Sequence, residues 1–488
     1  MVISSDINNA GLMKKQCSWR YLFLVVAMVS GVFSPIMAQR AVGKKHLSRP
    51  LPEQWAGDSL FVQQLPVTGR WWLNLDDTLL DSLITVAFAN SPDLKTLFYR
   101  VQSAQAALRM KQSVYYPSLQ ANFGWNKNQT SGRVSDGGTQ AREHFFSGAL
   151  TTTWEIDLFG ATTMQVRSQK AQYRISIETY NAALVSLAAQ VASAYAQLRV
   201  LQQQEIVARR NINSQKSILE MTEVRYETGL ASQLDVAQAR SVYFSTLATV
   251  PSIEAGIVVQ VNILALLVGT HPEALVPVLE KERPIPDFRA IVPVGVPANL
   301  LRQRPDIRAA EQSVVAAAAL VGASRADYLP RLTLTGSIGF ASQQMNEFFD
   351  HRSLTYSIAP SLTWTLFQGR QYTQATRQAR AEWQASIEQY NLTVLTAVQE
   401  VDNAMAYYKG AVKQLGVLYD LVEQGKITLT LSLDLYKRGL STFQNVLDAQ
   451  RSLLDYQNGL VSAQGIALTS VIDLYRALGG GWDNTSPE

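Results

Sequence analysis

The chain of 488 residues has a formal net charge of only +4, and its charged residues are spread along its length. Aromatic residues alternate with apolar positions and not with Lys or Arg, which excludes nucleic acid as an expected partner. No shift in composition divides the chain, so its length alone does not set a number of domains.

Two lysines precede an apolar run from Tyr21 to Phe33 that ends in small residues. This pattern predicts a secretory signal peptide at residues 1–38, because a membrane-spanning helix needs roughly 20 apolar residues and the run is shorter. The single cysteine, Cys17, precedes the run, so neither a disulfide nor a lipid anchor is predicted for the mature chain. No later stretch has the expected apolar length of a spanning helix. The exported chain is therefore expected either to be soluble or to cross a membrane with strands.

From Pro92 onward, one pattern occurs twice. An offset of 210 places Gly229 on Gly439, and upstream an offset of 213 places Pro92 on Pro305. The chain is therefore predicted to be a tandem duplication, in which each unit is half of a pseudo-symmetric wall and not a domain with its own active site. The expected divisions are an N-terminal periplasmic segment 39–91, a first repeat 92–270, a proline-rich linker 271–298, a second repeat 299–480 and a tail 481–488.

Each repeat begins with a predicted helix, which runs from Pro92 to about Tyr115 in the first repeat, and two strands follow it. Apolar and polar residues alternate in these strands, a pattern typical of strands with lipid on one face and water on the other. The alternative is a pair of half-buried hairpins in a soluble sandwich, but the strand lengths and the aromatic residues towards their ends favour a membrane. The predicted strands cover about 118–126, 145–155, 331–340 and 354–366, and polar loops at 126–144 and 341–353 join each pair.

After the strands, apolar residues recur at spacings of 3 and 4 in a sustained heptad pattern, from Ile177 to Leu201 and again from Ile387 to Ala411. This pattern predicts a helix of about 67 residues in each repeat, which would span on the order of 100 Å. The helices are expected to end at glycine turns, 226–232 and 436–442, from which a helix of about 36 residues returns. We expect a wall of helices with the strands at one pole and the turns at the other.

The number of strands predicts an assembly. Four strands cannot close a barrel around an aqueous lumen, and open strand edges are not tolerated in lipid, so the chain is expected to oligomerise. Two copies would give eight strands and a filled interior, whereas three would give twelve strands and a passage. The expected fold is mostly α-helical, with a trimeric α-barrel of long antiparallel helices continued by a twelve-stranded transmembrane β-barrel.

A family resemblance rests on the motifs Arg70–Trp72, Asn90–Leu94, Trp154–Gly160, Tyr226–Leu230, Arg304–Glu311, Pro360–Gly369 and Tyr436–Leu440. In these motifs the sequence resembles the outer-membrane efflux ducts, the TolC-like proteins, and most closely the branch that serves resistance-nodulation-division pumps. The resemblance implies a homotrimer in the outer membrane of a Gram-negative cell, with a barrel in contact with lipid and a helical tunnel in the periplasm. It also implies that an inner-membrane pump delivers substrate through a periplasmic adaptor protein.

In this family the two helix-turn-helix tips meet the adaptor. The resemblance assigns that contact to residues of both turns: Tyr226, Gly229, Leu230, Ser232, Gly439, Leu440 and Thr442.

The resemblance further implies a gate at the tips, where the tunnel closes. Three copies of Asp448 would form a carboxylate ring, and like charges held near a pore axis repel one another and attract cations. Asp235 matches a carboxylate that in the family is bonded to a tyrosine, here Tyr436. Gln444 and Asn445 complete the gate set, and Asn445 stands where some members carry a second acid, so a double ring is not expected. From the residues alone, Asp448 is a solvated carboxylate near a helix N-terminus.

The sequence contains no constellation that indicates an enzyme, a cofactor or a metal. The four histidines, His46, His144, His271 and His351, are far apart and have no paired spacing for a metal. Two alternatives to an efflux duct stay open. The same fold could serve a type I protein secretion system, and neighbouring adaptor and pump genes would distinguish that case. A coiled-coil scaffold without a pore, in the periplasm or at the cell surface, would not partition into the outer membrane.

Overall fold

The computed structural model describes residues 55, 61–62, 69–129, 131, 133, 142–287, 292–295 and 297–482, without the side chains of 300–302. All of them belong to one unit, Ser48–Glu488. The predicted signal peptide 1–38, His46 and most of the predicted tail 481–488 lie outside the described residues.

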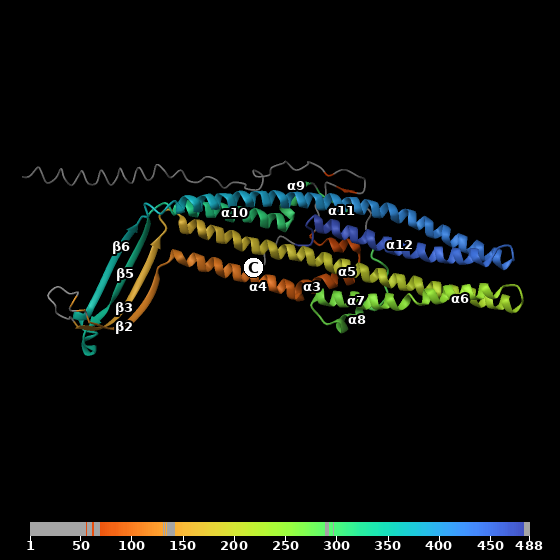
Figure 1. Ribbon diagram of the computed structural model, residues 1–488, viewed down its shortest axis with the longest axis horizontal. Coiled ribbons are helices and arrows are strands. Elements are labelled where there is room, and N and C mark those ends of the chain that lie inside the picture. The colour runs from red at the N-terminus through yellow and green to blue at the C-terminus, as the bar shows by residue number, and fades with distance from the viewer. Residues whose placement is uncertain are drawn as a thin grey trace, which may run out of the picture. The chain divides into compact units, whose positions relative to one another are not determined.

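The described chain is mostly helical, with long antiparallel helices and one four-stranded antiparallel sheet, as the sequence predicts. Figure 1 shows the sheet at one end of the helices and two turns at the other. The helices are α3 (Thr78–Asn90), α4 (Pro92–Gln112), α5 (Ala161–Glu227), α6 (Gln233–Leu247), α7 (Val250–Val268), α8 (Pro272–Leu279), α9 (Pro297–Gln303), α10 (Pro305–Ala326), α11 (Gln371–Lys437) and α12 (Phe443–Ala477). The strands are β1 (Phe61–Val62), β2 (Ser118–Gln129), β3 (Arg142–Ile156), β4 (Val292–Pro293), β5 (Arg331–Ser342) and β6 (Leu354–Thr363).

The four-stranded sheet has the order β2-β3-β5-β6, so β3 and β5 join the two repeats and β2 and β6 are its edges. Its register places the apolar residues of neighbouring strands opposite one another, for example Trp125 opposite Phe146 and Leu334 opposite Trp154. Residues that are directly opposite point to the same face of a sheet. The alternation in the sequence therefore produces one apolar face, on which residues such as Phe123 are largely exposed in the isolated chain.

Several predicted boundaries differ from the observed ones. The strands β2 and β3 extend to Gln129 and from Arg142, so the loop between them is shorter than predicted. The strand predicted at 354–366 ends earlier, at Thr363. The predicted return helix of the first repeat is interrupted between α6 and α7, because Pro251 has no N–H to donate to the carbonyl of Leu247.

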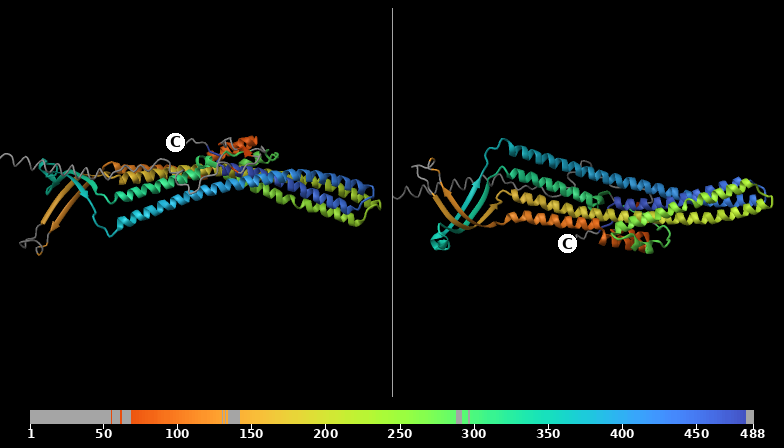
Figure 2. Two further views of the ribbon diagram at one scale, coloured as in Figure 1. Left: turned by 90° about the horizontal axis from the view of Figure 1, so that it is seen from above. Right: turned by 60° about the horizontal axis from the view of Figure 1, so that its bottom comes forward.

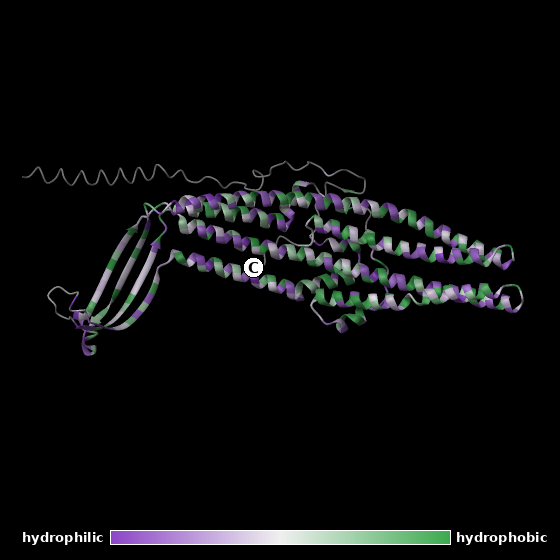
Figure 3. Ribbon diagram, in the orientation of Figure 1, coloured by the Kyte–Doolittle hydropathy of each residue, from purple (hydrophilic) through white to green (hydrophobic). Residues whose placement is uncertain are grey.

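One expectation about apolar length was wrong. By length and composition, two segments among the described residues could cross a membrane: α5, and the stretch Gln233–Val268 that contains α6 and α7. Their apolar windows differ in environment, since 61% of the window in α5 is buried inside the chain but only 22% of the window in Gln233–Val268. Apolar residues are dense along α7 (Figure 3). The α5 window serves packing within the chain, whereas most of the α7 surface has no cover from the chain itself.

The duplication is visible in the geometry as well as in the sequence. Helices α5 and α11 each contain 67 residues. Gly229 and Gly439, which follow them, have the same left-handed φ of 76°. At the opposite end, the indole Nε1 of Trp154 and that of Trp364 each donate a hydrogen bond of 3.0 Å to a carbonyl at the close of the preceding helical segment. The two repeats therefore have one architecture, and equivalent positions can be compared directly.

Helix α5 is the centre of the helical packing. On the side of the sheet the helices contact one another in the order α4, α5, α10, α11, and towards the turns α5 contacts α6, α7 and α12, while α12 also contacts α11. Figure 2 shows the row of four helices and the convergence of the two hairpins towards their turns. Helices α4 and α11 are therefore the outer members of the row.

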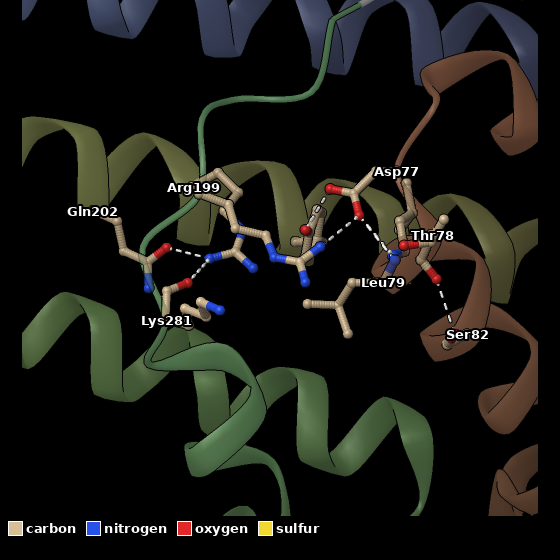
Figure 4. A network of polar contacts seen from close by, with 10 residues as sticks. Asp77, Thr78, Leu79, Ser82, Arg199, Gln202 and Lys281 are labelled. Carbon is tan, nitrogen blue, oxygen red and sulfur yellow. Dashed lines mark hydrogen bonds and ion pairs between the residues drawn. The ribbon is translucent and has the colours of Figure 1, made fainter.

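A polar network at the middle of α5 fastens the helical wall to the surrounding segments (Figure 4). The guanidinium of Arg199 is fully buried and donates to the side chain of Gln202 and, at 3.0 Å, to the carbonyl of Lys281. The Tyr195 hydroxyl donates to Asp77, and Asp77 in turn accepts hydrogen bonds from the first amides of α3. Burial together with this hydrogen bond raises the pKa of Tyr195 to about 12. The network therefore ties α3 and the inter-repeat linker to the same stretch of one long helix.

The motif that begins α10 is structural, as its helix-start pattern indicates. Arg304 forms two hydrogen bonds with Asp306 in its own helix start. It also pairs with Glu400 of α11 at 2.7 Å and donates to the carbonyl of Ala477, the last residue of α12, at 2.8 Å. One guanidinium thus connects the ends and flanks of three helices.

Close packing of α12 on α5 depends on a glycine. A Cβ atom at Gly465 would overlap the side chain of Val200. We expect Gly465→Ala to lower the free energy of unfolding by about 1–3 kcal/mol, the usual cost of overpacking. Gly416→Ala in α11 is the matched control, because a Cβ there meets nothing within 4 Å. That substitution should be neutral or stabilising by up to about 1 kcal/mol. Denaturant unfolding followed by circular dichroism measures both, and equal effects would contradict the packing argument.

Candidate functional site

The two turns at the far end of the helices have the same backbone design. Gly229 and Gly439 are left-handed, a conformation that costs glycine little, and a side chain there would be strained. The amide of Leu230 donates to the carbonyl of Arg225 at 2.7 Å, and the amide of Leu440 donates to the carbonyl of Leu435 at 2.9 Å. These bonds satisfy carbonyls at the helix ends and fix the direction in which the chain returns.

Each turn carries an exposed leucine. Leu230 is 66% exposed and Leu440 is 71% exposed, and the neighbouring Leu234 is 64% exposed. Tyr226, Gly229, Ser232, Gly439 and Thr442, which the sequence analysis places with them, are exposed too. Large apolar side chains that project together from a polar surface are typical of a protein contact.

An apolar cluster beneath the turns joins the two hairpins. Its buried members come from α5, α6, α11 and α12: Ile218, Ala239, Val242, Tyr436, Phe443, Val446 and Leu447. The rings of Tyr436 and Phe443 lie 5.1 Å apart between centroids. The hairpins therefore form one packed body below their turns, and a movement of one hairpin must disturb this cluster.

Arg225 links the two hairpins, although the sequence analysis did not single it out. Its Nη1 donates to the carbonyl of Lys437 at 3.0 Å, and its guanidinium lies 4.8 Å from the centre of the Tyr436 ring. A cation at the C-terminal end of a helix is stabilised by the helix dipole, and here it belongs to the other hairpin. The one available signal was a mismatch between the repeats, since the position equivalent to Arg225 is Leu435.

The expected bond between Asp235 and Tyr436 is not formed. The carboxylate of Asp235 accepts the amide of Ser232 at 3.2 Å, and the Ser232 hydroxyl accepts the amide of Asp235 at 3.1 Å. This reciprocal capping box satisfies the start of α6 and occupies the carboxylate. The Tyr436 hydroxyl is buried and has no hydrogen-bond partner among the described residues. Burial, and to a smaller extent the nearby Asp235, raises the pKa of Tyr436 above its ordinary value.

The remaining gate residues lie on the first turns of α12. The side-chain amide of Gln444 donates to Asp448 at 2.9 Å, and that of Asn445 donates to the hydroxyl of Ser441 at 2.9 Å. Asp448 is exposed and lines a hollow of about 450 Å³ between α11 and α12. Within the described part of the chain it forms no salt bridge, so its charge is not neutralised by a cation.

The site contains no arrangement for chemistry. Among the described residues, no group of three or more His, Cys, Asp or Glu side chains could hold a metal ion. What the site offers is a pair of exposed apolar turns, an unneutralised carboxylate near them and a buried contact that couples the two hairpins.

Comparison with known proteins identifies both repeats. Residues 83–270 and 296–480 match the sequence profile described as Outer membrane efflux protein. The toluene efflux pump outer membrane protein TtgF of Pseudomonas putida is 30% identical over 420 residues, which cover 86% of this chain and 87% of the relative. The pyoverdine export outer membrane protein OpmQ of Pseudomonas aeruginosa is 29% identical over 439 residues, which cover 89% and 92%.

Solved structures share the fold. The outer-membrane channel OprN superposes with a TM-score of 0.84 at 29% sequence identity, over 89% of this chain and 98% of that one. The open state of the MtrE outer membrane channel of Neisseria gonorrhoeae superposes with a TM-score of 0.72 at 25% identity, over 88% and 95%.

The Arg225 contact can be tested by exchange. Arg225→Met keeps an unbranched side chain but removes the cation and the hydrogen bond to Lys437, a loss of about 1–2 kcal/mol. We expect faster hydrogen–deuterium exchange in both turns, 226–232 and 436–442. Arg240→Met is the control, because Arg240 pairs only with the exposed Glu223 at 2.7 Å and such pairs contribute little. Acceleration confined to the first turn would show that Arg225 does not couple the hairpins.

Proposed function

The chain belongs to the outer membrane efflux protein family, and from that membership we propose that three copies form the exit duct of a tripartite efflux system. As a member of this family it is a channel of the Gram-negative outer membrane and a transporter without enzymatic activity. The proposal concerns its assembly, its partners and its gate.

A single observation carries the proposed assembly: the four-stranded sheet with one apolar face has two free edges, β2 and β6. Backbone groups at a strand edge need hydrogen-bond partners in lipid, and only a closed barrel supplies them all. Two chains would close eight strands around a filled interior, whereas three would close twelve strands around a passage. The trimer is thus the smallest ring that both closes the sheet and conducts.

The helices continue this ring into the periplasm. With 67 residues, α5 and α11 each extend about 100 Å from the sheet to the turns. An inner-membrane pump can reach such an exit only through contacts at its far end, and the exposed Leu230 and Leu440 are suited to a periplasmic adaptor. The relatives named for toluene efflux and pyoverdine export favour an efflux system over protein secretion.

The gate follows from the position of Asp448. In a ring of three copies, its carboxylates would face one another near the axis, where like charges repel one another and attract cations. Gln444 would orient each carboxylate through its hydrogen bond of 2.9 Å. Asp235 and Tyr436 contribute indirectly in this proposal, Asp235 by capping α6 and Tyr436 by packing in the cluster below the turns.

The gate can be tested in planar lipid bilayers. We expect the channel to be cation-selective, and Asp448→Ala to raise the single-channel conductance several-fold and to weaken the selectivity, because the repelling ring is lost. Asp473→Ala is the control, since it removes one carboxylate from the same helix far from the turns. Unchanged conductance in the Asp448 variant would remove this residue from the constriction and leave the duct intact.

The adaptor contact can be tested in cells. We expect Leu230→Asp together with Leu440→Asp to abolish efflux through the cognate pump, while the protein still reaches the outer membrane in normal amounts. Leu266→Asp is the control, because Leu266 is 74% exposed but lies on α7, away from the turns. Full efflux by the double variant would contradict the proposed docking surface.

A further inference from the structure

Inside the chain, α5 and α10 are joined by a shielded ion pair. Arg308 of α10 contacts Glu178 of α5 at 2.6 Å, and the Glu178 side chain is only 8% exposed. The offsets of the duplication place Glu178 on Glu388 and Lys95 on Arg308. The second pair has the same charges as the first.

Glu388 and Lys95 lie on the two outer helices of the row α4, α5, α10, α11. Both are exposed. Glu388 accepts only a local bond of 3.3 Å from Asn391, which repeats the bond of 3.2 Å from Asn181 to Glu178. Lys95 has no salt bridge within the described part of the chain. The duplicated pair is therefore complete in its residues but separated in space.

A second polar pair shows the same relation. Gln204 of α5 donates to the hydroxyl of Ser462 in α12 at 3.2 Å. The offset of 210 relates these residues to Gln414 of α11 and Ser252 of α7, which have the same two side chains. Both Gln414 and Ser252 are exposed in the isolated chain.

Apolar residues on the same outer surfaces repeat the contrast. Four exposed side chains have repeat equivalents that are buried: Met110 (71% exposed) and Ala323 (6%), Leu395 (52%) and Val185 (7%), Val417 (68%) and Val207 (9%), Val258 (58%) and Leu468 (1%). The first member of each pair lies on α4, α7 or α11. These exposed positions thus have the pattern of a buried interface that the chain alone does not complete.

We propose that α11 of one copy packs against α4 and α7 of the next, in the same way as α5 packs against α10 and α12 within the chain. Glu388 then pairs with Lys95 of the neighbouring copy, and Gln414 bonds to Ser252 of that copy. The contact is head-to-tail, so the repeats follow one another around a closed ring. This inference rests on the proposed trimer and adds the residues that hold it together.

The intrachain contact supplies a disulfide design for the contact between copies. A Cβ at Gly322 would lie 3.7 Å from the Cβ of Met164, within the normal range for a disulfide. The equivalent positions are Arg109 and Gln374, both exposed. In a Cys17→Ser background, Arg109→Cys with Gln374→Cys should give covalent trimers after mild oxidation, resolved on non-reducing denaturing gels.

Matched controls separate this result from chance oxidation. Because the contact is head-to-tail, Arg109→Cys alone and Gln374→Cys alone should give no covalent trimer. Gly322→Cys with Met164→Cys should form a disulfide inside one chain and leave its mass unchanged. If the double variant is trimeric by native mass measurement and conducts in bilayers but does not cross-link, the proposed interface is wrong and the duct stands. If the parent protein forms no trimer in lipid, the proposed function itself fails.

Charge reversal tests the ion pair independently. We expect Lys95→Glu and Glu388→Lys each to lower the temperature at which the detergent-solubilised trimer dissociates, and the double reversal to restore most of the loss. Arg210→Glu is the control, as an exposed reversal on α5, away from the outer helices of the row. A double reversal no better than the single ones would overturn the Glu388–Lys95 pair.

Discussion

The free edges of the four-stranded sheet are the constraint on which the rest of the structure depends. In water, the backbone groups of β2 and β6 could bond to solvent, but in hydrocarbon they need strands from other chains. A chain with this sheet is therefore incomplete in a membrane, and its helices must be arranged so that copies can join. The outer positions of α4 and α11 in the helical row meet that need, because they continue the edges of the sheet into the periplasm.

Duplication provides a second use for one solution. The packing of α5 on α10 and α12 is tested by the fold of each chain, and the same geometry is then available wherever equivalent helices meet. The repeats have diverged where their surroundings differ. Arg199, which is buried against the linker in the first repeat, is matched by Lys409 in the second. Arg225 joins the two hairpins, whereas its equivalent, Leu435, does not carry a charge.

The long helices were predictable to within a few residues, because a heptad pattern sustained over many turns and a glycine at its end leave little freedom. The boundaries of the strands were less accurate, since hydrogen bonds between strands extend beyond the alternating residues. The interruption at Pro251 was missed because the apolar pattern continues through it. Asp235 was assigned to the wrong partner: a carboxylate at the third position of a helix competes first for the capping amide, which the pattern of the gate does not reveal.

The equal length of α5 and α11 has a further consequence. Each helix acts as a ruler for the distance between membrane and tip, and both rulers in a chain must agree for the two turns to lie level. A deletion in one repeat alone would shift its tip by about 1.5 Å per residue and rotate its apolar stripe by about 100°. The reach of the duct across the periplasm can therefore change in evolution only by matched steps of whole heptads in both halves.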